Sequence, residues 1–264
     1  MLFLTPVITI YILVMAFIFG AVFASFLGCM GWRMSRGESV MKGRSHCDTC
    51  GHTLGVRDLI PIISYVARKG RCAYCKERIP VSSLIGELVL AILFVLTTMR
   101  FDISVKLILM LFFVCILYLI TLTDLYEQII PNSCILVAIV VRFIYYFVFE
   151  SFQWETLLGL VGNGLALSLP MLILVLIMEK ILKKEAMGGG DIKLVFVTGM
   201  YLGWQQNMLM LLFACMIGIV FAYIQAQKEG ESVPIPFGPS LAIGSVISML
   251  VGEQIITWYL SLFY

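Results

Sequence analysis

The chain has 264 residues, of which 61% are hydrophobic and only 13% are charged. A soluble domain of this length cannot bury so many apolar side chains, so the composition excludes an ordinary soluble protein and predicts a membrane protein with several spans. The formal net charge of +2 says little about partners, and we expect no nucleic-acid partner.

Continuous apolar runs predict an all-α polytopic membrane protein with about eight transmembrane helices. The runs do not alternate in polarity, as the strands of a lipid-embedded barrel would. Each span needs roughly 17–25 apolar residues, and the run at 192–203 is short for a complete span. The expected spans are 5–30, 84–98, 104–123, 134–149, 156–178, 192–203, 208–224 and 241–258.

Basic residues predict the orientation of these spans. Ten of the 18 Lys and Arg residues lie between Arg33 and Arg78, in a long polar stretch, which the positive-inside rule places in the cytoplasm. Counting spans from this stretch puts Asp124 and Asp191 at the cytoplasmic boundary of the membrane. Glu87 lies about one turn into the second span, where an acid must be paired or line a cavity.

The polar stretch contains two Cys-x2-Cys pairs: Cys47 and Cys50, then Cys72 and Cys75. Cytoplasmic thiols stay reduced, and four thiolates at this spacing suit a tetrahedral zinc ion. Gly51 and Lys76 follow the pairs at the position of a tight turn. Because four thiolates leave no open coordination position, the zinc would be structural and residues 31–83 would form a small zinc-binding domain. A redox or free-thiol cluster is the alternative.

The stretch Met187–Lys193 reads Met-Gly-Gly-Gly-Asp-Ile-Lys and places Asp191 at the edge of a span. A carboxylate there is costly and is by default a functional hypothesis, for which Asp124 is the best partner. Two close carboxylates share one proton, so one can act as base on water while the other polarises a peptide carbonyl. The sequence does not assign these two roles.

The triple glycine run, Gly188, Gly189 and Gly190, has no Cβ atoms and would let an extended substrate backbone approach Asp191 closely. Each feature also has a simpler interpretation. Asp191 suits the N-cap of a helix that begins at Ile192, the glycines suit a flexible turn, and Asp124 suits a solvated charge at the interface. None of these interpretations explains two aspartates at the same membrane depth.

Taken together, these residues resemble the bacterial type IV prepilin peptidases, also called leader peptidase/N-methyltransferases, over nearly the whole chain. Asp124 with Ile130-Pro131-Asn132 is similar to the family's first aspartate motif. Gly188 to Lys193 is similar to its GxGD motif, which also marks the wider class of intramembrane aspartyl proteases. The segment Pro236–Pro239 is similar to the one before the family's last helix, and the four-cysteine stretch resembles the family's N-terminal half.

The resemblance implies cleavage of a prepilin or pseudopilin leader at the cytoplasmic face, followed by N-methylation of the new N-terminus from S-adenosylmethionine. It implies a multi-pass protein of the bacterial inner (cytoplasmic) membrane, in contact with the lipid bilayer. Residues 1–30 would be the first transmembrane helix and residues 84–264 the aspartyl protease domain. Gly28 and the stretch 82–84 depart from the family pattern, both in the half associated with methylation.

Two other functions use the same residues differently. In a proton-coupled transporter, Asp124 and Asp191 would relay protons, but the sequence has no visible pair of half-repeats and the glycine run lies at the membrane edge. In a membrane methyltransferase with structural aspartates, activity would survive Asp191→Ala.

Overall fold

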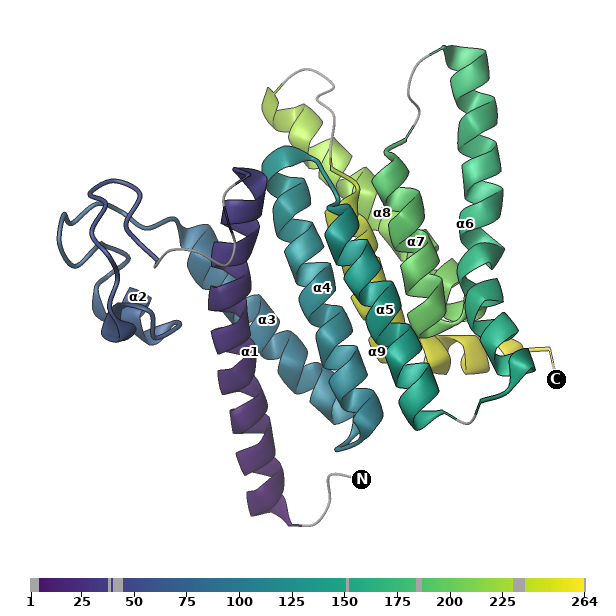
Figure 1. The fold of residues 1–264 in the computed structure, drawn as a ribbon, viewed down its shortest axis with the longest axis horizontal. Coiled ribbons are helices and arrows are strands. Elements are labelled where there is room, and N and C mark those ends of the chain that lie inside the picture. The colour runs from purple at the N-terminus through teal and green to yellow at the C-terminus, as the bar shows by residue number, and fades with distance from the viewer. Residues whose placement is uncertain are drawn as a thin grey trace. The chain divides into compact units, whose positions relative to one another are not determined.

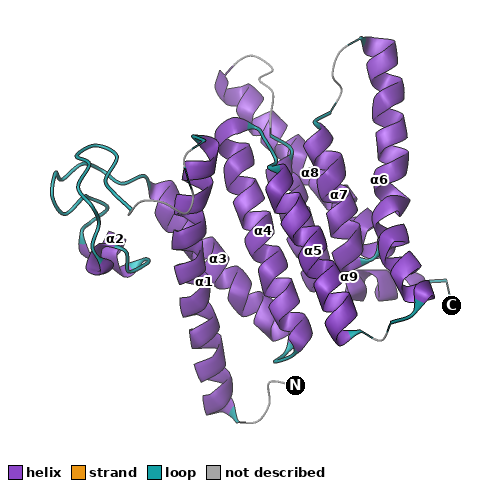
Figure 2. Ribbon diagram, viewed as in Figure 1, coloured by secondary structure: helices purple, strands orange, loops and turns teal. Residues whose placement is uncertain are grey.

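The structure is a computed structural model that describes residues 5–37, 39, 45–150, 152–183, 187–229 and 236–263. These residues form helices and, between α1 and α3, a long segment of mostly loops and turns, with two isolated β-bridges and no strands (Figure 2). Residues 38 and 40–44 of the expected zinc-binding domain lie outside the described part of the chain.

Seven helices in the described residues are long and apolar enough to cross a membrane, which confirms an all-α polytopic fold. The run at 192–203, expected to be short, is α7 (Gly189–Leu202), which has only 14 residues and is not among the seven. The seven are α1 (Pro6–Ser35), α3 (Val81–Phe101), α4 (Val105–Glu127), α5 (Asn132–Phe149), α6 (Trp154–Leu182), α8 (Trp204–Glu229) and α9 (Gly238–Leu260).

The chain divides into two compact units, Met1–Leu122 and Thr123–Tyr264. In the first unit, α1 packs closely along α3 (Figure 1). A Cβ atom on Gly20 would lie 2.7 Å from the Cα atom of Ala91, so glycine permits this close approach of the two backbones. The fully buried side chain of Leu90 lies at the same contact.

The four-cysteine segment of the first unit contains a short 3-10 helix, η1 (Val56–Asp58), and the five-residue helix α2 (Ile63–Ala67). Its backbone contacts α3 directly, because the N–H of Ile62 donates a hydrogen bond of 2.7 Å to Oε2 of Glu87. Glu87 is only 8% exposed. The expectation that this buried acid has a polar partner is therefore confirmed.

In the second unit, the short helix α7 is central and packs against α5, α6, α8 and α9 (Figure 1). Its side chains Leu194, Val195 and Val197 are fully buried. Polar contacts add to this apolar packing, since Thr198 donates a hydrogen bond of 2.7 Å to Oδ1 of Asn207 on α8. These four helices therefore fix the position of α7, whose first turn carries Asp191.

Candidate active site and metal centre

Asp124 lies in the last turn of α4 and is 5% exposed. Its Oδ2 atom accepts a hydrogen bond of 2.8 Å from the backbone N–H of Gly238, the first residue of α9. The sequence marked Pro236–Pro239 as a helix boundary but gave no sign that Gly238 contacts Asp124. The end of α4 and the start of α9 therefore meet at one buried carboxylate.

Asp191 lies in the first turn of α7 and is half-buried. The N-cap of α7 is Gly188, whose carbonyl accepts a hydrogen bond of 3.1 Å from the N–H of Asp191. The interpretation of Asp191 as the N-cap is therefore wrong, because Gly189 and Gly190 are already helical. The carboxylate is close enough to Asp124 for the charge of one to act on the other, so the structure brings the two aspartates together.

The two aspartate motifs also contact each other through their neighbouring residues. A Cβ atom on Gly190 would lie 2.9 Å from the Cβ atom of Ile130, so the third glycine makes room for this isoleucine. The Lys193 ammonium donates a hydrogen bond of 2.8 Å to Oδ1 of Asn132, the first residue of α5. The start of α7 is thereby held against the segment that follows Asp124.

The other two glycines have a different environment. Gly188 and Gly189 are exposed, and no atom lies within 4 Å of the position that a Cβ atom would take on Gly189. The φ angle of Gly188 is −63°, which any residue adopts, so its backbone conformation does not require glycine. Only Gly189 leaves open space near Asp191, because a Cβ atom on Gly188 would lie 3.2 Å from Oδ2 of Asp191 and Gly190 is filled by Ile130.

The four-cysteine cluster is fully assembled in the structure. The sulfur atoms of Cys47, Cys50, Cys72 and Cys75 all lie within 4.8 Å of one another, and those of Cys47 and Cys75 are 3.8 Å apart. Zinc–thiolate bonds of about 2.3 Å in a tetrahedron place neighbouring sulfurs roughly 3.8 Å apart. The four cysteines could therefore hold a metal ion, and their spacing fits zinc.

Two similar turns carry the cysteine pairs, as the sequence predicted. The backbone N–H of Cys47 bonds to the carbonyl of His52, and that of Cys72 bonds to the carbonyl of Glu77. Gly51 and Lys76 occupy equivalent places, with φ of +68° and +62°. Backbone N–H groups of the second pair also favour the thiolate form of its first cysteine, because they lower the pKa of Cys72 to about 7.

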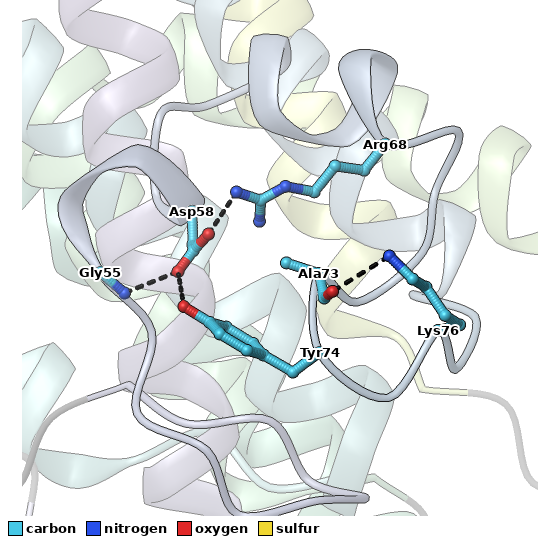
Figure 3. A network of polar contacts seen from close by, with 6 residues as sticks. All are labelled: Gly55, Asp58, Arg68, Ala73, Tyr74 and Lys76. Atoms are coloured by element: carbon cyan, nitrogen blue, oxygen red, sulfur yellow. Dashed lines mark hydrogen bonds and ion pairs between the residues drawn. The ribbon is translucent and has the colours of Figure 1, made fainter.

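Asp58 connects the parts of this domain (Figure 3). Its Oδ2 atom accepts hydrogen bonds from the backbone N–H of Gly55 at 2.8 Å and from the Tyr74 hydroxyl at 3.4 Å. Its Oδ1 atom forms an ion pair with Arg68. The Gly55 hydrogen bond, followed by the contacts with Arg68 and Tyr74, holds the pKa of Asp58 below its ordinary value despite its desolvation. Sequence reasoning missed this residue, because a single aspartate in a polar segment carries no signal.

Comparison with known proteins points to one family for both halves of the chain. Residues 18–101 match the bacterial peptidase A24 N-terminal domain, and residues 111–223 match the type IV leader peptidase family. A prepilin leader peptidase/N-methyltransferase of Bacillus subtilis is 31% identical over 248 residues, which cover 93% of this chain and 97% of the relative.

Relatives from other bacteria carry the same name. The protein of Aeromonas salmonicida is 31% identical over 84% of this chain and 76% of its own length. That of Pseudomonas aeruginosa is 32% identical over 82% of this chain and 74% of its own length. No solved structure matches the chain.

Proposed function

Because this chain belongs to the type IV leader peptidase family, we propose that it cleaves the leader peptide from type IV prepilins or pseudopilins, with Asp124 and Asp191 as the catalytic pair. One observation carries the proposal: the last turn of α4 and the first turn of α7 bring a buried and a half-buried carboxylate within range of each other's charge. Placing ionisable side chains in membrane helices costs free energy, so such residues are rare and usually mark a functional site.

The chemistry needs one proton shared between two carboxylates. The ionised aspartate takes a proton from water as the oxygen attacks the scissile carbonyl, and the protonated aspartate gives its proton to the carbonyl oxygen. When the tetrahedral intermediate collapses, the first aspartate protonates the leaving nitrogen and the second recovers a proton from a hydroxyl group. The C–N bond is broken, one water is consumed, and the pair returns to its starting state.

The substrate would approach across the exposed glycines. An extended peptide has to bring its backbone within a few ångströms of the carboxylates. Gly189 provides open space there, and Gly188 has no side chain to crowd the Asp191 carboxylate. We further propose that this end of the second unit faces the cytoplasm and that the protein lies in the bacterial cytoplasmic membrane. The cluster of basic residues between Arg33 and Arg78 supports this orientation.

The cysteine cluster would hold a structural zinc ion within a cytoplasmic domain of residues 31–83, between the first helix (1–30) and the protease domain (84–264). The ion, when bound by Cys47, Cys50, Cys72 and Cys75, would cross-link the segment. Such cross-links would compensate for the small apolar core of a segment of this size. Its four positions are filled by thiolates, so it would take no part in hydrolysis.

The relatives' names also suggest N-methylation, and we propose it as a second activity of this chain. S-Adenosylmethionine would be a co-substrate that supplies the methyl group to the new N-terminal amine. Methylation must follow cleavage, because that nitrogen is part of a peptide bond until the leader is removed.

The test is incubation of the purified protein with a prepilin, followed by mass analysis of the product. The wild-type chain should release the leader, and Asp124→Asn or Asp191→Asn should lower the rate by more than ~10³-fold, since members of one catalytic unit are not additive. Glu127→Gln is the matched control, because Glu127 lies on the same helix one turn away and is exposed. Cleavage that persists in either aspartate variant would favour a transporter or a methyltransferase with structural aspartates.

A further inference from the structure

The Gly238 hydrogen bond distinguishes the two aspartates. A helix begins with backbone N–H groups that have no partner inside the helix, and a side chain just before it usually accepts from one of them. At the start of α9 the N-cap is Phe237, which has no side-chain capping bond. The carboxylate of Asp124 takes that place from another helix, with its Oδ2 atom 2.8 Å from the Gly238 nitrogen.

The neighbouring residues make this contact specific. A Cβ atom on Gly238 would lie 2.5 Å from Oδ2 of Asp124, so any side chain at this position would displace the carboxylate. The next residue, Pro239, has no N–H to offer, and the N–H of Leu241 already bonds to the carbonyl of Phe237. Gly238 is therefore the donor that the first turn of α9 directs at Asp124.

Asp191 lacks a comparable donor. Within the described residues its carboxylate accepts no hydrogen bond. Its Oδ2 atom lies 3.2 Å from the position that a Cβ atom would take on Gly188. Only Asp124 has an N–H group that bonds to its charged form. Such charge-assisted bonds are stronger than neutral ones, and more so where water is scarce.

Several charged side chains on α4, α5, α7 and α9 have other partners or are exposed. The Lys193 ammonium on α7 is bonded to Asn132, and Glu127 on α4 is exposed. On α5 the arginine, Arg142, is paired with Glu150 near the far end of the helix. On α9 the nearest carboxylate, Glu253, is fifteen residues beyond Gly238 in the sequence.

We propose that Asp124 enters catalysis ionised, as the base that takes a proton from water, and that Asp191 enters protonated, as the acid that gives its proton to the carbonyl oxygen. The N–H of Gly238 positions Asp124 and favours its charged form. This assignment rests on the proposed peptidase function, to which it adds the order in which the two carboxylates ionise.

The first experiment removes the hydrogen bond alone. Replacing Gly238 by glycolic acid turns one backbone amide into an ester and deletes the N–H without adding a side chain. The acidic limb of the pH profile of kcat/KM should move to higher pH by about one unit, because a hydrogen bond to a charged group shifts ionisation by roughly that much. If Asp191 ionised first, the alkaline limb would move instead.

A matched ester tests for a merely structural effect. Replacing Leu241 by its hydroxy-acid analogue removes the bond to Phe237 in the same turn of α9, away from Asp124, and both limbs should stay in place. Equal shifts in the two ester variants, or a shift of the alkaline limb in the Gly238 ester, would overturn the assignment.

The second experiment needs neither the ester nor enzymatic activity. The sequence has five aspartates, so carbon-13 labelling of their carboxyl groups allows each to be titrated by NMR. Asp124 in the Asp191→Asn protein should titrate at least about one pH unit below Asp191 in the Asp124→Asn protein. The reverse order would refute the assignment. Absence of cleavage by the wild-type chain, with the expected order intact, would refute only the peptidase function.

Discussion

The ammonium of Lys193 donates a hydrogen bond of 2.8 Å to the side-chain oxygen of Asn132, across 61 positions of sequence. Lys193 follows Asp191 by two residues in α7, and Asn132 begins α5 just after the turn that leaves Asp124. The bond therefore joins the segments that carry the two carboxylates, and it does so at the surface, where neither side chain is needed for packing.

Removal of this bond should misplace the carboxylates without unfolding the protein. We expect Lys193→Met to lower the cleavage rate roughly three- to tenfold, because small displacements of reacting groups are costly, while thermal stability falls by no more than ~1 kcal/mol. Initial rates and thermal unfolding of the same preparations measure both effects. Lys180→Met, which removes an exposed lysine from the last turn of α6, should change neither.

Substitutions of the glycines that precede Asp191 should distinguish an effect on stability from an effect on substrate binding. Gly190→Ala places a methyl group against Ile130 and should destabilise the protein by about 1–3 kcal/mol through overpacking. Gly189→Ala enters open space and should leave stability unchanged, but it should raise KM if substrate passes there. Thermal unfolding and a Michaelis–Menten series report the two outcomes. An unchanged KM in Gly189→Ala would place the substrate elsewhere.

The purified protein should contain one zinc ion per chain. Cys72→Ser should remove it and expose the surrounding segment to protease, because metal binding and folding of such a domain are coupled. Elemental analysis of protein prepared without chelators gives the zinc content. Cys215→Ser, at an exposed cysteine on α8, is the control and should retain the metal. Preparations of the wild-type chain with no zinc would contradict the assignment.

Glu87 should anchor the cysteine segment to α3. Glu87→Leu would leave the N–H of Ile62 without its acceptor, at a cost of about 1–3 kcal/mol for a buried donor. Glu87→Gln keeps an acceptor oxygen and should behave like the wild type. Limited proteolysis of residues 45–80 should therefore be faster in the leucine variant alone. Equal cleavage rates in the two variants would show that the hydrogen bond does not hold the segment.

Cleavage should proceed without S-adenosylmethionine, because hydrolysis needs only water and the acid–base pair. With the methyl donor present, the mature pilin should gain ~14 Da at its N-terminus, the mass of one CH₂. Intact-mass analysis of the same substrate with and without the donor separates the two activities. An uncleaved precursor that gained the methyl mass would contradict the order proposed here.

Local patterns predicted much of this structure. Apolar runs give the helices because lipid leaves backbone groups no partners outside the segment. The Cys-x2-Cys spacing predicts the paired turns, in which the structure shows positive φ angles at Gly51 and Lys76. The membrane depth of Asp124 and Asp191 followed from counting spans. This depth stays a prediction, and the structure adds that Asp124 lies in the last turn of α4 and Asp191 in the first turn of α7.

Other features depend on contacts that no local pattern encodes. The Gly238 bond spans 114 positions and uses a backbone N–H, which every residue except proline possesses. Helix α7 starts at Gly189, where Ile130 packs against Gly190, whereas local preference favours the aspartate as the cap. The catalytic roles of the aspartates stay predictions until the variants are measured.

The shortness of α7 sets a relation between this protein and the thickness of its membrane. Fourteen helical residues extend ~21 Å, whereas the hydrocarbon layer is about 30 Å thick. If Trp204, half-exposed just beyond its C-terminal end, anchors α7 at one interface, Asp191 at the other end lies below the opposite lipid surface. Because other helices surround α7, either water must fill the missing length at this end or the lipid must thin around the whole unit. A hydrolase within a bilayer needs such a depression, and a thicker membrane would close it.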